Sequence, residues 1–169
     1  MAVSLHDVAA PLFQAQLSAL SAVLGKGAAF AEAKKIDQSV LVNARLAPDM
    51  FPLSRQVQIA TDIARGGIAR LAGLEPPKEE DKEASFADLK ARVQRTLDYI
   101  AGISPAAFDG AESRQVTIKM GGNDVSMPGL KYLTWFVIPN VGFHCATAYD
   151  ILRHNGVEIG KRDFLGPKD

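Results

Sequence analysis

The stretch Pro128-GLKYLTWFVIPNVGFHCATAYDILRHN-Gly156 is a long apolar segment that predicts a helix with polar residues inside its apolar stripe. On a helical wheel, His144 lies within about 40° of Val137 and Ile151, and Asn140 lies one turn earlier. Polar groups that face a core need partners there, because an unsatisfied buried donor costs roughly 1–3 kcal/mol. This stripe is therefore where the sequence places its candidate chemistry.

Three further segments repeat apolar residues at helical spacing. The first begins at Ser4 and is expected to end at Gly25 and Gly27. The second follows Pro52, and the third opens at Ser85 with a variant of the capping box. The expected helices cover residues 4–24, 53–73, 85–100 and 129–154, with a kink at Pro139 and a short extra helix over 28–35.

A change of period before the last helix predicts a β-hairpin. Val116, Ile118 and Met120 alternate with polar residues and are followed by Gly121-Gly122. The expected fold is all-α, a four-helix bundle with this hairpin inserted before the last helix, in one domain of residues 1–169. Residues 36–52 and 103–128 are the longer connections that could hold a crossover.

Composition excludes several partners. Lys plus Arg and Asp plus Glu each number 19, so no net field favours nucleic acid. The densest charged run, Lys78–Glu83, mixes both signs and is expected to be a solvated linker. The single cysteine, the lack of an export signal and the lack of a membrane span predict a cytoplasmic protein with no membrane partner.

The candidate site residues are the polar side chains that point into the bundle: Gln16, Gln56, Asn140 and His144. One interpretation is a small-ligand pocket between helices. The other is a core network in which amides and imidazole bond one another. Gln58 and Asp62 point away from the apolar stripe of their helix and are interpreted as a solvated or subunit-facing surface.

Residue types argue against a tight transition-metal site. The chain has three histidines, and His144 and His154 are about 15 Å apart along one helix. The sequence does not place His6 relative to His144. Amide oxygens from Gln56 and Asn140 are poor ligands for zinc or nickel. His144 is the best single candidate for a divalent metal ion, but no cofactor and no catalytic residue is assigned.

Aromatic residues are spread around the last helix beyond what a single buried stripe requires. Because these aromatic residues lie on several sides of the helix, we predict a homodimer that forms through helix faces. The residues concerned are Tyr132, Trp135, Phe136, Phe143 and Tyr149.

The strings Leu46-APDMFPLSRQV-Gln58, Pro139-Asn140, Phe143-His144 and Thr147-AYDILRHNGVEIG-Lys161 resemble a bacterial family of unknown function in the DinB/YfiT-like metalloenzyme superfamily. The resemblance implies a four-helix bundle, often dimeric, with relatives that hold a divalent metal by three histidines. Some of those relatives are thiol-dependent transferases. The matching positions here are Gln56 and either Asn140-x-x-x-His144 or His144-x-x-x-Ala148, which leaves one histidine.

Three functions follow as hypotheses. The first is a DinB-like protein that binds a small ligand in a polar pocket and lacks the three-histidine metal site. The second is a divalent-metal-dependent hydrolase or thiol transferase that uses His144. The third is a non-enzymatic dimeric protein whose polar core residues fix the register of its helices.

Overall fold

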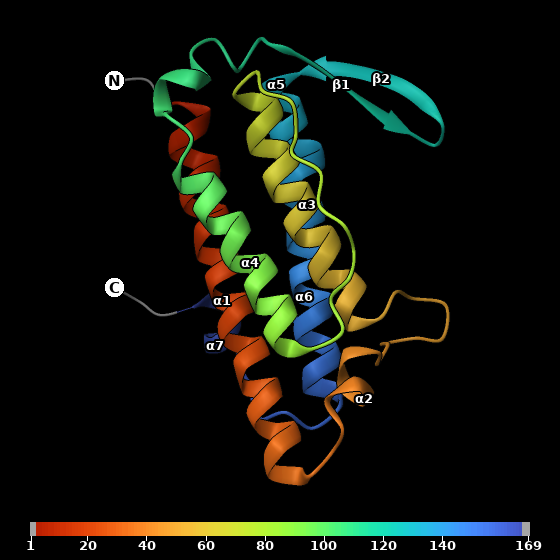
Figure 1. The fold of residues 1–169 in the computed structure, drawn as a ribbon. Helices are drawn as coiled ribbons and strands as arrows, with labels where there is room; N and C mark the ends of the chain where they lie inside the picture. The colour runs from red at the N-terminus through yellow and green to blue at the C-terminus, as the bar shows by residue number, and fades with distance from the viewer. Residues whose placement is uncertain (1–2, 167–169) are drawn as a thin grey trace.

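The computed structural model describes residues 3–166 and confirms the four-helix bundle with its inserted hairpin (Figure 1). Helices α1 (Leu5–Lys34) and α3 (Leu53–Leu71) lie at opposite corners of the bundle, and each packs against both α4 (Phe86–Ala101) and α6 (Ile138–His154). The short helices are α2 (Gln38–Val42), η1 (Pro105–Phe108), α5 (Gly129–Lys131), η2 (Tyr132–Val137) and α7 (Lys161–Leu165).

Helix α1 is longer than predicted, because Gly25 and Gly27 do not end it and the separate helix expected over 28–35 is its last part. It continues to Lys34 and stops at Lys35, which adopts the left-handed conformation with φ 55°. A Cβ on Gly27 would lie 3.0 Å from the ring of Phe86 and 3.1 Å from Leu152. The glycine thus permits α1 to approach α4 and α6 closely, a packing role that the local sequence does not distinguish from a helix stop.

Within residues 3–166, α1 alone is long and apolar enough to cross a membrane by length and composition. Its apolar residues are used inside the bundle, where Phe13, Leu17 and Leu24 are completely buried. The helix therefore has the composition of a core helix.

The crossover connection lies between α3 and α4, not in either of the two connections considered from the sequence. Both helices run in the same direction, so residues 72–85 return along the full length of the bundle (Figure 1). We call this extended segment the strap. An extended chain advances about 3.3 Å per residue, against 1.5 Å in a helix, so the strap is long enough to span α3.

The hairpin forms as predicted, from β1 (Gln115–Met120) and β2 (Asn123–Pro128) paired antiparallel. Its two turn residues, Gly121 and Gly122, have φ values of 57° and 86°, which a two-residue turn of this kind requires. After β2 the chain enters α5 and then the π-helical η2 before α6. Pro139, expected as a kink, lies in the first turn of α6, where its missing N–H is tolerated, and the irregularity precedes it as η2.

Candidate functional site

Gln56 and His144 meet between α3 and α6. Gln56 lies in the first turn of α3, where the loop before Pro52 folds back over it, and His144 lies in the middle of α6. His144 Nδ1 is 2.7 Å from Gln56 Oε1. Gln56 is 1% exposed and His144 is 9% exposed, so the two polar groups satisfy each other within the core.

A backbone carbonyl fixes which ring nitrogen of His144 carries the proton. Gln56 Nε2 donates to the carbonyl of Phe51 at 3.0 Å, and a carbonyl oxygen only accepts. The amide is thereby oriented with Oε1 toward the imidazole, so Nδ1 of His144 must be the donor. In the neutral ring Nε2 then keeps its lone pair.

The second ring nitrogen has a different environment from the first. Among the described residues none hydrogen-bonds Nε2 of His144, and this atom is not fully enclosed. Burial lowers the pKa of His144, and the charge of nearby Arg55 lowers it further. A lowered pKa keeps the ring neutral at pH 7, so Nε2 is an available hydrogen-bond acceptor.

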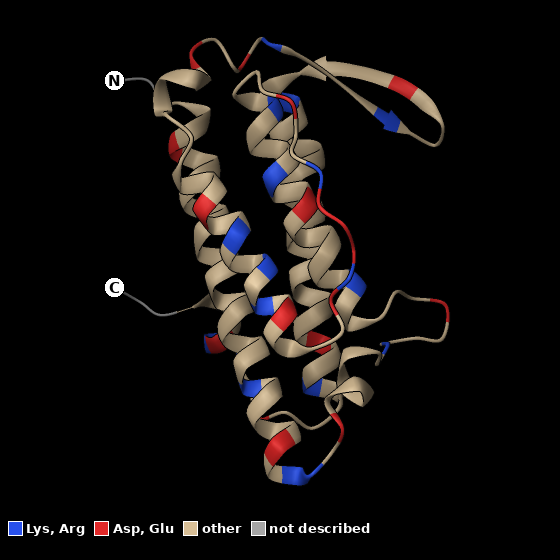
Figure 2. Cartoon of the chain, viewed as in Figure 1, with Lys and Arg blue, Asp and Glu red and all other residues tan. Residues whose placement is uncertain are grey.

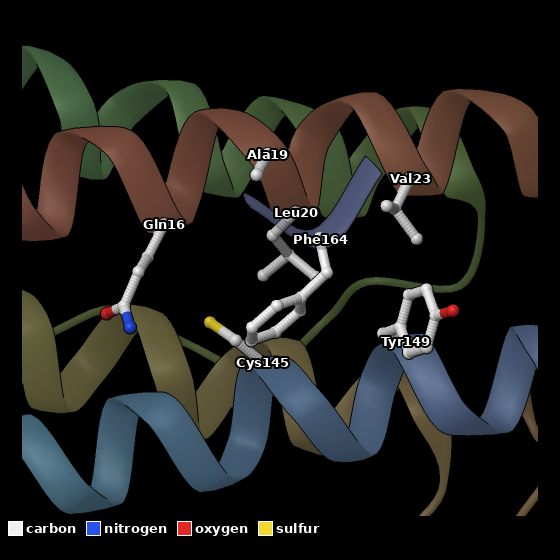
Figure 3. A pocket seen from close by; sticks show the side chains of 7 residues that line it. All are labelled: Gln16, Ala19, Leu20, Val23, Cys145, Tyr149 and Phe164. Carbon is white, nitrogen blue, oxygen red and sulfur yellow. The ribbon is translucent and has the colours of Figure 1, made fainter. Parts of the chain in front are cut away.

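The other two predicted site residues do not join this pair. Asn140 is half-buried and donates from Nδ2 to the carbonyl of Phe136 at 2.6 Å, one turn earlier in the same segment. Gln16 projects from α1 toward α6 into a cavity shared with Cys145 and Tyr149 (Figure 3). Among the described residues no hydrogen bond joins Asn140 to Gln56 or His144, because its amide nitrogen donates to a backbone carbonyl of the same helical segment.

The residues present do not fit a three-histidine metal site. At the resembling positions, Gln56 uses its oxygen to bind His144, and Asn140 uses its amide nitrogen on Phe136. His6 lies in the first turn of α1, at the opposite end of the bundle from the start of α3 (Figure 1). Within residues 3–166, no three His, Cys, Asp or Glu side chains cluster as metal ligands. We therefore derive no metal-dependent step.

A buried ionic network lies where the sequence suggested solvent. Gln58 is 6% exposed because the strap covers it, and its Nε2 donates to Glu83 at 2.9 Å. Arg92 of α4 is completely buried and pairs with Asp62 at 2.7 Å and Glu83 at 3.1 Å. Arg65 pairs with Asp62 and with Glu79 of the strap. The solvated interpretation is wrong for Gln58, whereas Asp62 keeps 40% of its side chain exposed. In the charged run, Lys78, Glu80, Asp81 and Lys82 are exposed as expected, and Glu79 and Glu83 turn toward the bundle.

The charges of this network fasten the strap to the bundle. Figure 2 shows acidic and basic residues along the strap, with basic residues on α3 and α4 beside it. Burial opposes the charge of Arg92, but Asp62 and Glu83 outweigh it and raise the pKa of its guanidinium. Burial also raises the pKa of Asp62, an effect that Arg92 and Arg65 offset in part. The network is a structural anchor for the crossover.

The bundle topology and the inserted hairpin together define a DinB-like helical protein. A crystal structure of a DinB family member protein from Shewanella denitrificans matches with a TM-score of 0.91 and 44% identity, over 97% of this chain and 93% of that one. The chain belongs to the family described as domain of unknown function DUF1993, whose model matches residues 5–165. No curated protein matches the chain.

Proposed function

We propose that this DinB-like protein binds a small molecule through Nε2 of His144 and works without a three-histidine metal site. The observation that carries the proposal is the fixed tautomer: the Phe51 carbonyl orients Gln56, and Gln56 Oε1 accepts a hydrogen bond from Nδ1–H of His144 at 2.7 Å. The remaining nitrogen is a neutral acceptor that is not fully enclosed by the described residues.

The surroundings of His144 specify the class of ligand. The ring of Phe143 packs edge-on against His144 with centroids 5.2 Å apart, and Phe143 is 55% exposed. A ligand that suits this environment has an N–H or O–H donor for Nε2 and an aromatic or apolar body for Phe143. Arg55, whose charge acts on His144, disfavours a cationic ligand.

The matched test uses benzamide and N,N-dimethylbenzamide, which share a ring and a carbonyl but differ in the N–H donor. We expect benzamide to shift the side-chain ¹⁵N signal of His144 Nε2 saturably, and the dimethyl compound to do so much more weakly. Equal effects of the two compounds, or shifts confined to other residues, would contradict the proposal. A His144→Leu variant removes the acceptor and serves as the control.

A zinc titration separates this proposal from metal-dependent catalysis by His144. One imidazole nitrogen without further His or carboxylate ligands is expected to give only weak binding. Stoichiometric binding of Zn²⁺ that is lost in His144→Leu would favour the hydrolase or transferase hypothesis instead.

We further propose that the protein is a cytoplasmic homodimer. The support is that Trp135 and Phe143, both in the η2–α6 segment, are each 55% exposed, and large exposed aromatic side chains are typical of subunit contacts. Light scattering of the wild type and of Trp135→Glu tests this. A mass of one chain for the wild type at micromolar concentrations would contradict it.

A further inference from the structure

A small cavity lies between α1, α6 and α7 (Figure 3), whereas the Gln56–His144 pair lies between α3 and α6. Its volume is about 10 Å³, which is the room that one water molecule needs. The wall is apolar except for the amide of Gln16 and the thiol of Cys145. The lining residues are Gln16, Ala19, Leu20, Val23, Cys145, Tyr149 and Phe164.

The amide of Gln16 is the unusual feature of this cavity. Its Oε1 is fully enclosed and has no hydrogen-bond partner within residues 3–166. Buried polar atoms are normally paired, and an unpaired acceptor costs roughly 1–3 kcal/mol. Burial raises the pKa of the Cys145 thiol to about 12, so this thiol is uncharged at pH 7. The site therefore has one unused acceptor in apolar surroundings.

Phe164 of α7 fills most of the remaining space. Its ring points in toward Cys145 (Figure 3) and makes an edge contact with Tyr149 at 5.9 Å between centroids. No residue of α7 is fully buried. Besides the Phe164 contact, a partly exposed ion pair joins α7 to the bundle, Lys26 Nζ to Asp163 Oδ1 at 2.6 Å. Helix α7 packs against α1 through partly buried residues, so it is expected to open at a lower cost than the long helices of the core.

We propose that this cavity is a second ligand site, for a single-ring aromatic molecule with one hydroxyl or amino donor. The ring takes the place of the Phe164 side chain when α7 opens, and the donor bonds Gln16 Oε1. Phe164 thus acts as an internal occupant that the ligand displaces. The site is separate from His144, so it stands or falls independently of the function proposed above.

Phenol and toluene are suitable probes because they have nearly the same shape and differ in the donor. In the full-length protein, phenol is expected to shift the methyl NMR signals of Ala19, Leu20 and Val23 saturably. Its affinity should exceed that of toluene by about fivefold, the effect of one hydrogen bond. Gln16→Leu keeps the side chain long but removes the acceptor, and it should abolish this preference. Equal affinities in the wild type, or shifts elsewhere only, would overturn the proposal.

Two variants test the displacement of Phe164. Phe164→Ala removes the occupant and should raise phenol affinity about tenfold or more, because the closed form no longer competes. Lys26→Ala loosens α7 without changing the cavity, and it should raise the affinity in the same direction even if Phe164→Ala folds poorly. The matched control is Leu165→Ala, in the same helix but 59% exposed, which should leave the affinity unchanged. Unchanged affinity in both test variants would show that α7 is not the cover.

Discussion

Gln56 Oε1 on α3 accepts a hydrogen bond from Nδ1 of His144 on α6 across 2.7 Å, and the carbonyl of Phe51 holds the other end of the same amide. This chain of two bonds joins the loop before α3, α3 itself and α6. It leaves Nε2 of His144 as the accessible acceptor on which the proposed function depends.

Gln56→Leu should destabilise the protein by about 1–3 kcal/mol, because it leaves the Nδ1–H of His144 buried and unpaired. Asn140→Ala is the matched control. It loses one bond from a half-buried side chain to Phe136 and should cost about 1 kcal/mol or less. Urea unfolding measures both, and equal small effects would mean that the Gln56–His144 bond does not stabilise the fold.

The stability of the wild type should depend on pH through His144. Burial lowers the pKa of this residue in the folded protein, so the unfolded chain binds the proton at higher pH. The contribution of His144 is complete above about pH 6.5 and falls as the pH drops from there to the folded pKa. In His144→Gln this pH dependence should disappear. The free energy of unfolding is measured against pH for the wild type and the variant, and the difference between them is the contribution of His144. If this contribution of His144 instead increased as the pH falls, the pKa of His144 would be raised in the folded protein, against the prediction.

The ionic network predicts unequal costs for two neighbouring arginines of α4. Arg92→Ala should cost about 3–5 kcal/mol, because the buried carboxylate of Glu83 loses its nearest cation and keeps the neutral amide of Gln58. Arg95 is 55% exposed and also pairs with strap carboxylates, yet Arg95→Ala should cost less than about 1 kcal/mol. Proteolysis within the strap reports its release, which we expect in the Arg92 variant only. Equal stability of the two variants would mean that the buried pairs do not hold the strap.

Adjacent glycines of α3 offer a test of the helix packing. A Cβ on Gly67 would lie 2.6 Å from Val137, which is completely buried, so Gly67→Ala forces the core to shift. Overpacking destabilises the variant, and the higher helix propensity of alanine offsets part of that effect. The expected net loss of stability is about 1–2 kcal/mol. At Gly66 the near atom is the flexible end of Arg70, so Gly66→Ala should stabilise by up to about 1 kcal/mol. Thermal unfolding of both variants checks the contrast.

Periodicity and capping were enough to predict the bundle, the hairpin and the start of α4. Ser85 and Asp88 form the expected reciprocal cap, with Asp88 N donating to Ser85 Oγ at 3.1 Å. The wheel of the last helix also placed His144 on the stripe that faces the core, where its side chain is buried. These features are local or depend on one helix face, which is why the sequence carries them.

Features that depend on the path of the strap were not predictable in the same way. Gln58 and Asp62 lie on the polar face of their helix, and only the covering strap buries or shields that face. One signal was present: Arg92 falls in the apolar stripe between Leu89 and Thr96, where a buried cation needs acidic partners. The strap carries those acidic residues, but neither the sequence of the strap nor the periodicity of α4 predicts that the two segments pair.

The most direct test of the central claim is the ¹⁵N chemical shifts of the His144 side chain at pH 7.5 in a long-range ¹H–¹⁵N correlation spectrum. We predict a neutral ring with the proton on Nδ1 and an unprotonated Nε2. In Gln56→Leu we expect the two ¹⁵N chemical shifts of the ring to change. In the wild type, a neutral ring with the proton on Nε2, or a doubly protonated ring at this pH, would contradict the prediction.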